Sequence, residues 1–240
     1  MKLLALDTAS GVCSVALLAD GQLIARTAAT ARDHAQLLLP MVDEVLVESA
    51  LTLRGLDGIA FGRGPGSFTG LRIAAAVTQG LAAGAGLPVL PVSDLRALAE
   101  GARAAVPEAD RAAAGGWLLA CMDARMGELY WGVFQNRGQP VGEAQGGERL
   151  GPPQSLDSGL AGLLPDGGVV EAAAGMGLAI IPELATQLGL AAAHCLSQAE
   201  PQAADIARLA AADLAAGARW LDPVAAQPVY LRDRVVQAPL

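Results

Sequence analysis

The spacing of apolar and polar positions changes several times along this chain, and the changes predict an α/β protein. Three short apolar runs come first, and an Asp20-Gly21 turn between the second and the third is typical of a β-hairpin. In the first half we expect strands at 2–7, 12–19, 22–28, 56–61 and 87–92, and helices at 34–50, 67–83 and 93–105. The resulting order is β-β-β-α-β-α, followed by one more strand and one more helix.

The second half repeats this order in weaker form after the segment 104–116, which lacks an apolar period and is predicted to be a linker. Beyond it we expect strands at 117–122, 128–134, about 139–145 and 168–173, and helices at 153–163, 177–188 and 202–216. The predicted fold class is therefore α/β, with two duplicated β-β-β-α-β-α domains. Residues 1–103 form the expected N-terminal domain and 117–201 a second, degenerate one, while 202–240 is a candidate to pack back on the first.

The composition limits the classes of protein that this chain could be. Of its 240 residues 53% are hydrophobic, which is too many for a disordered chain. The formal net charge of −8 opposes binding to a phosphate backbone, and no basic cluster in the sequence offsets it. The three cysteines have no CxxC spacing and are expected to be buried and reduced. The uncharged stretch 73–92 is mostly Ala and Gly, so we expect no membrane segment and a soluble, cytoplasmic protein.

Two turns have the residue types that bind phosphate. An acidic, hydroxyl-bearing turn follows the first strand, and the glycine-rich run GRGPGSFTGLR lies between a strand and a helix. Backbone N–H groups at such turns can bind an anion, but both turns can equally serve as tight corners of the fold. The acidic turn alone favours the hairpin reading, and the glycine-rich run leaves the two readings close to even. The residues that would form degenerate phosphate-type turns are Asp7, Thr8, Gly64, Gly66 and Ser67.

The two helices on either side of the glycine-rich run are apolar on more than one face. At roughly 100° per residue, the apolar side chains of 34–50 spread over an arc of about 220°. The helix 67–83 is rich in Ala and Gly, so another backbone can approach it closely. One face of each helix should pack on the sheet, which leaves the other for a second chain. The candidate interface residues are Leu38, Met41, Val42, Val45, Gly70, Ile73, Ala74, Ala76, Val77 and Gly80.

Several common catalytic arrangements are missing from the sequence. It has two histidines, His34 and His194, and no HExxH motif, Cys/His cluster or GxSxG elbow. We therefore expect no metal site and no cofactor, and we expect His34 to be a surface or capping residue. The acidic turn at Asp123 to Glu128 is expected to be held by an Asp–Arg contact.

Five motifs stand out when they are taken together. They are Asp7-Thr8-Ala9-Ser10, His34-Ala35-Gln36 with the segment up to Pro40, GPGSFTGLR at 64–72, Asp123-Ala124-Arg125 with Glu128 and Tyr130, and Pro228 to Arg232. In these motifs the chain resembles the bacterial TsaB (YeaZ) family, most closely over residues 1–100. The resemblance implies an actin-like fold of the Hsp70 and sugar-kinase type. The chain departs from the family pattern at Ala9-Ser10, at Met126, and at Asp94, where a serine is common.

The resemblance also implies a function. Family members are non-catalytic subunits of the machinery that installs N6-threonylcarbamoyladenosine next to the anticodon of tRNA. The resemblance implies that the first two helices bind a TsaD-like catalytic subunit, or a second copy of the chain when TsaD is absent. It also implies that a TsaE-like ATPase joins the complex. Contact with tRNA would be indirect. Two alternatives remain: an ATP-dependent phosphotransferase of the same fold, using Asp7 and the Gly62–Gly66 loop, and a metallopeptidase of the M22 type.

Overall fold

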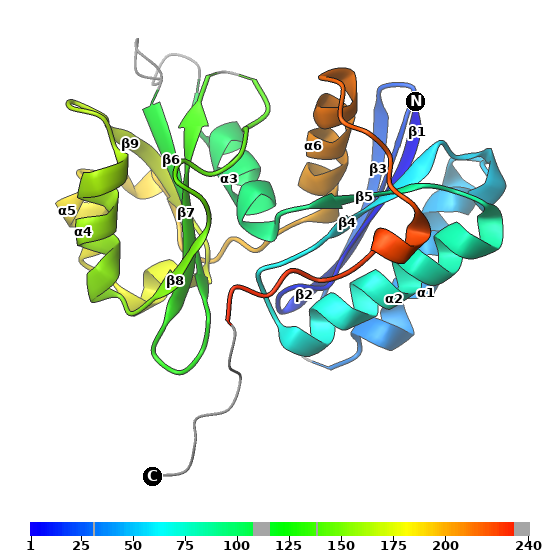
Figure 1. The fold of residues 1–240 in the computed structure, drawn as a ribbon, viewed down its shortest axis with the longest axis horizontal. Coiled ribbons are helices and arrows are strands. Elements are labelled where there is room, and N and C mark those ends of the chain that lie inside the picture. Colours follow the sequence, from blue (N-terminus) through cyan, green and yellow to red (C-terminus); the bar gives the residue numbers. More distant parts are fainter. Residues whose placement is uncertain (31, 108–115, 138, 233–240) are drawn as a thin grey trace.

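The computed structural model describes residues 1–30, 32–107, 116–137 and 139–232, and in these residues the strands form two five-stranded mixed sheets. The first sheet has the order β3-β2-β1-β4-β5, and the second has the equivalent order β8-β7-β6-β9-β10 (Figure 1). The strands are β1 Lys2–Asp7, β2 Val12–Ala19, β3 Gln22–Ala29, β4 Gly58–Gly62, β5 Val89–Val92, β6 Gly116–Asp123, β7 Leu129–Asn136, β8 Arg149–Gly151, β9 Val170–Ala174 and β10 Cys195–Leu196. The duplicated, actin-like α/β architecture is confirmed.

The helices cover both faces of each sheet. They are α1 His34–Glu48, α2 Phe68–Ala85, α3 Asp94–Ala105, α4 Gln154–Leu163, α5 Leu184–Gln187 and α6 Ala203–Ala215, with short 3₁₀ turns η1 Leu53–Gly55, η3 Met176–Ile180, η4 Ala192–His194 and η5 Pro223–Ala225. In the described part of the chain, no helix is both long enough and apolar enough to cross a membrane.

The last helix of each half packs against the sheet of the other half. Helix α3 follows β5 of the first sheet but lies against β6, β7 and β9 of the second. Helix α6 follows β10 of the second sheet but lies against β1 and β2 of the first. The two helices also contact each other, so they form a shared layer between the sheets (Figure 1).

Among the residues that the structure describes, three apolar clusters fill the spaces between these layers. The central cluster joins α3 and α6 to the facing sides of both sheets. A second cluster lies between the first sheet and the pair α1 and α2, which lie side by side on its outer face (Figure 1). The third cluster lies between the second sheet and α4, η3 and α5.

The expected elements of the first half agree with the structure to within a few residues, and two expectations for the second half are wrong. The third strand is β8, Arg149–Gly151, rather than a strand near 139–145, because Gly146 and Gly147 adopt positive φ angles of 69° and 83° and make a turn before it. The helix expected at 177–188 is divided into η3 and the short α5. Pro182 lies between them and disfavours helical backbone in the residue before it.

The expected linker is described only at its ends. Residues 104 and 105 are the last two of α3, and Gly116 begins β6. Residues 108–115 lie outside the described part of the chain.

Candidate partner-binding face

The glycine-rich run forms the corner between β4 and α2, as its pattern predicts. Ser67 is the N-cap residue of α2, and its hydroxyl accepts a hydrogen bond from the backbone N–H of Gly70 at 3.4 Å. Gly64 has a φ of +107°, and a Cβ atom there would lie 2.7 Å from the carbonyl oxygen of Val229. A glycine is therefore needed at this position, both for its backbone angle and because the backbone of Val229 lies so close.

The β1–β2 turn lies directly against this corner. The backbone N–H of Ser67 donates to the carbonyl oxygen of Ala9 at 2.7 Å, and the hydroxyl of Thr8 donates to the carbonyl oxygen of Gly70 at 2.7 Å. A Cβ atom at Gly66 would lie 2.5 Å from the carbonyl oxygen of Ala9, and one at Gly70 would lie 1.9 Å from that of Thr8. The β1–β2 turn and the glycine-rich corner are thus adjacent. Their polar groups form hydrogen bonds with each other rather than facing a phosphate group.

Asp7 is turned into the protein rather than toward an open turn. It is fully buried, its Oδ1 accepts from the backbone N–H of Ala9 at 2.9 Å, and its carboxyl group lies beside that of Asp94, the first residue of α3. Burial raises the pKa of Asp7 to about 6, and burial together with the negative charge of Asp7 raises the pKa of Asp94 well above its ordinary value.

The expectation that His34 is a surface or capping residue is wrong. It is buried at the start of α1, and its Nε2 lies 3.1 Å from the carbonyl oxygen of Ser10. The imidazole therefore helps to fix the β1–β2 turn against α1. Within the described residues, no group of three or more His, Cys, Asp or Glu side chains is arranged to hold a metal ion.

Six of the ten expected interface residues are buried within this chain. They are Leu38, Met41, Val42 and Val45 in α1, and Gly70 and Ala74 in α2. The expectation that these six contact a partner is therefore corrected. The apolar arc of α1 is wide because α1 packs on β2 and β3 and also on α2, so its second apolar side meets a neighbouring helix of the same chain.

The other four expected residues reach the surface. Ile73 and Val77 are half-buried, and Ala76 and Gly80 are exposed. Their spacing along α2 is i, i+3, i+4 and i+7, which places them in one row on the helix. We call this row, Ile73, Ala76, Val77 and Gly80, the α2 outer row.

Further exposed apolar and small residues lie on α2 and on α1. Ala83 and Gly84 continue the α2 outer row toward the end of α2, and a Cβ atom at Gly80 or Gly84 would meet no atom within 4 Å. On α1, Leu39 is 45% exposed and Val47 is 79% exposed. Our interpretation of the sequence missed these four because it did not separate the inner from the outer side of each helix.

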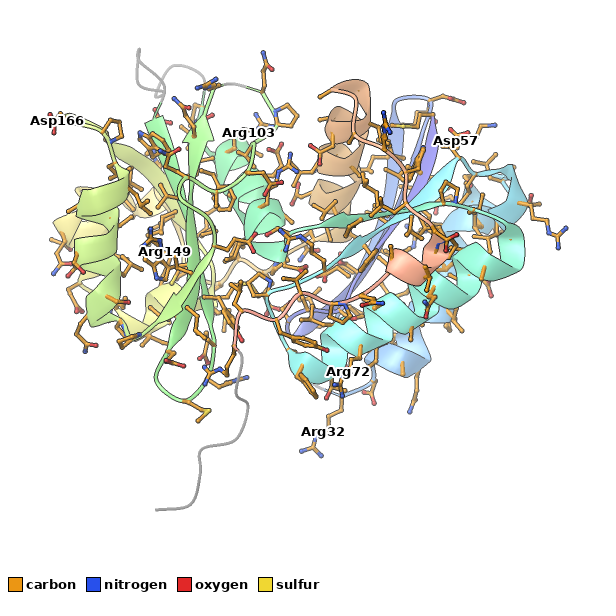
Figure 2. All side chains as sticks on the ribbon, viewed as in Figure 1. Arg32, Asp57, Arg72, Arg103, Arg149 and Asp166 are labelled. Atoms are coloured by element: carbon orange, nitrogen blue, oxygen red, sulfur yellow. The ribbon has the colours of Figure 1, made fainter. Side chains whose placement is uncertain are left out.

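The segment 228–232 runs past one end of α2 and contacts both halves of the molecule. The backbone N–H of Val229 donates to the carbonyl oxygen of Arg63 at 2.7 Å. The hydroxyl of Tyr230 accepts from Nε of Arg72 at 3.2 Å, and its ring lies 5.4 Å from that of Phe68 (Arg72 is labelled in Figure 2).

Arg232 then reaches the turn between β6 and β7. Its guanidinium contacts the carboxylate of Glu128 at 2.6 Å and the carbonyl oxygen of Ala124 at 3.1 Å. In that turn Nη1 of Arg125 lies 3.1 Å from the Asp123 carboxylate, so the expected Asp–Arg contact is confirmed. Three motifs that are far apart in the sequence thus form one contact region.

The fold and these turns define the class of protein, because two copies of the same mixed sheet that exchange their last helices are the architecture of the actin-like α/β proteins. A family model described as "TsaD: tRNA N6-adenosine threonylcarbamoyltransferase" matches residues 27–233. The protein "tRNA threonylcarbamoyladenosine biosynthesis protein TsaB" of Escherichia coli K12 is 37% identical over 238 residues, which cover 98% of this chain and 96% of that protein. The chain belongs to the TsaB (YeaZ) family.

Two further comparisons agree with this assignment. The protein of the same name from Haemophilus influenzae is 47% identical over 131 residues, which cover 55% of this chain and 52% of that protein. The solved structure described as "YeaZ from Pseudomonas aeruginosa" has a TM-score of 0.79 and 36% identity, and the match covers 96% of this chain and 99% of that one.

Proposed function

We propose that this chain is a non-catalytic subunit of the machinery that makes N6-threonylcarbamoyladenosine in tRNA, where it binds and stabilises a TsaD-type catalytic subunit. Its membership of the TsaB family supports the process, because the relatives from E. coli and H. influenzae are named for threonylcarbamoyladenosine biosynthesis. The observation that carries the binding role is the exposed α2 outer row.

The α2 outer row has the properties of a helix-packing surface. Two of its residues, Ala76 and Gly80, have side chains no larger than a methyl group, so a partner helix can approach to the usual interaxial distance of about 8–10 Å or closer. Ile73 and Val77 lie beside them and provide apolar area that a partner would remove from water. A helix presented by a related subunit fits such a row better than a polar ligand does.

The closed turns support a role without catalysis. In a phosphotransferase of this fold, Asp7 and the Gly62–Gly66 loop would have to face a nucleotide. Here the backbone N–H of Ser67 and the hydroxyl of Thr8 donate to backbone carbonyl oxygens of the same chain. Asp7 is buried beside Asp94. These contacts favour the subunit over the phosphotransferase.

The same proposal includes the other partners that the family resemblance implies. A TsaE-like ATPase would join the assembled pair, and a second copy of the chain would occupy the same face when the catalytic subunit is absent. The acidic net charge of −8 supports contact with tRNA through the complex rather than by this chain alone.

The binding role can be tested with one charged substitution and a matched control. Ala76→Arg places a guanidinium in the centre of the α2 outer row, and Ala161→Arg places the same side chain on an exposed position of α4. Copurification with a tagged TsaD-type subunit should fall at least about tenfold for Ala76→Arg and stay unchanged for Ala161→Arg. Equal copurification of both variants and the wild type would reject this face.

The non-catalytic role has a separate test. The purified chain, incubated alone with tRNA and threonylcarbamoyl-adenylate, should make no modified nucleoside. Addition of the TsaD-type catalytic subunit should allow the modified nucleoside to form. Formation of the nucleoside by this chain alone would overturn the role.

A further inference from the structure

A pair of buried carboxyl groups lies where the two halves of the molecule meet. Asp7 is the last residue of β1, and Asp94 is the first residue of α3, the helix that packs against the second sheet. Both residues are 0% exposed, and their carboxyl groups lie beside each other next to Gly62. A Cβ atom at Gly62 would lie 2.3 Å from Oδ1 of Asp94 and 2.6 Å from Oδ1 of Asp7, so the glycine leaves just enough room for the pair.

One oxygen of each carboxyl group has a backbone donor. Oδ1 of Asp7 accepts from Ala9, and Oδ2 of Asp94 accepts from Gly64. The remaining two oxygens, Oδ2 of Asp7 and Oδ1 of Asp94, are buried and have no hydrogen-bond donor among the described residues. Two ionised carboxylates offer only acceptors, so a hydrogen bond between them requires a proton.

We propose that Asp7 and Asp94 share one proton at neutral pH, and that this proton fastens the β1–β2 turn to the first turn of α3. A single proton shared by the two carboxyl groups lets one of them donate to the other and removes the repulsion of two buried negative charges. The β1–β2 turn is also hydrogen-bonded to the start of α2 through Thr8 and Ala9. Loss of the proton therefore weakens the contact of the first sheet with the layer between the sheets.

The charged groups around the pair favour retention of the proton. Glu200 adds negative charge beside Asp7, and its Oε1 would lie 3.3 Å from a Cβ atom at Gly11. Arg63 lies on the side of Asp94, but its guanidinium is also 3.5 Å from the carboxylate of Glu148. Burial and the charge of Asp7 raise the pKa of the Cys13 thiol to about 11, so Cys13 stays neutral and adds no charge.

The sign of the pH dependence follows from the raised pKa values. Burial raises the pKa of Asp7 to about 6 and that of Asp94 well above its ordinary value, so the folded state binds more protons than the unfolded state. The stability of the fold therefore falls as the pH rises through these values, and one shared proton changes the unfolding equilibrium constant by up to about tenfold per pH unit.

The test compares thermal and denaturant unfolding of the wild type, Asp94→Asn, Asp7→Asn and the control Asp166→Asn from about pH 4 to about pH 9. Asp166 lies in an exposed turn at the edge of the second half (Figure 2). An asparagine at position 94 can accept from Gly64 and donate to Asp7 without any titrating proton. The wild type and Asp166→Asn should lose stability in parallel with rising pH, and either single variant of the pair should lose markedly less.

Two further measurements keep the proposal falsifiable. The double variant Asp7→Asn/Asp94→Asn places two amide donors against each other and should be less stable than either single variant. The difference infrared spectrum of the wild type minus Asp94→Asn at neutral pH should contain the C=O stretch of a protonated carboxyl group. Parallel pH curves for the wild type and Asp94→Asn, absence of that band, or stabilisation of the wild type by Mg²⁺ through this pair would overturn the proposal.

Discussion

The inner and outer sides of α2 are built from the same small residues, but these residues serve different purposes. On the inner side, Gly70 is a glycine because the backbone of Thr8 lies where a Cβ atom would be, 1.9 Å away. On the outer side, a Cβ atom at Gly80 would meet nothing within 4 Å. Ala74 and Ala76 differ in the same way, since the first is fully buried and the second is exposed.

This difference shows that residue size alone does not identify a binding face. A small residue against the chain's own backbone is explained by the fold. A small residue with open space above it has no such explanation, and it leaves room for another helix. The outer side of α2 is therefore the side that we propose as the partner-binding face.

The largest expected effect is on the inner side, at Leu38 of α1. Leu38 is 0% exposed, so Leu38→Asp would bury an unpaired carboxylate and lower the free energy of unfolding by about 4 kcal/mol or more. Circular dichroism during denaturant unfolding should show a protein that is largely unfolded or very unstable. A well-folded variant that has only lost its partner would mean that α1 binds through the side assigned here to the core.

Gly70→Ala should have the next largest effect. The added methyl group meets the carbonyl oxygen of Thr8, which is backbone and cannot turn away, so we expect a loss of about 3 kcal/mol in the free energy of unfolding. Urea unfolding gives this value directly. Stability equal to that of the wild type would show that the β1–β2 turn does not lie against α2.

Thr78→Val should stabilise the inner side. Thr78 is fully buried, and its hydroxyl has no hydrogen-bond partner among the described residues. Replacing the hydroxyl by a methyl group of similar size should raise the free energy of unfolding by about 1 kcal/mol. A decrease of that size instead would indicate a hydrogen bond from this hydroxyl.

Gly80→Ala should have the smallest effect on folding. Gly80 is exposed within a helix, and alanine is favoured over glycine there by roughly 0.5–1 kcal/mol. Urea unfolding of Gly80→Ala and Gly70→Ala should therefore give changes of opposite sign in the same helix. Equal destabilisation by both substitutions would remove the distinction between the two sides.

The local parts of the fold could be predicted from the sequence. The short apolar runs located β1 to β5, and the apolar pattern located the helices between them. The glycine-rich run located the corner before α2, with Ser67 as its N-cap. These features depend on residues close together in the chain. The same is true of the Asp123–Arg125 contact.

The features that the sequence analysis missed depend on long-range packing. The burial of Leu38 and Val45 arises because α1 meets both the sheet and α2, and the burial of His34 arises from its contact with Ser10. The pairing of Asp7 with Asp94 depends on α3 starting beside the end of β1. The spacing of apolar residues along the sequence gives no information on such long-range contacts. Strand β8 was missed for another reason, because a strand of three residues is too short to show alternation.

The most direct test measures the affinity of a TsaD-type subunit for the wild type and for Ala76→Arg, together with the free energy of unfolding of each. The exposed site should tolerate the arginine, with a change in stability within about 0.5 kcal/mol, while the affinity falls at least about tenfold. Unchanged affinity in a fully folded Ala76→Arg variant would contradict the assignment of the α2 outer row as the partner-binding face.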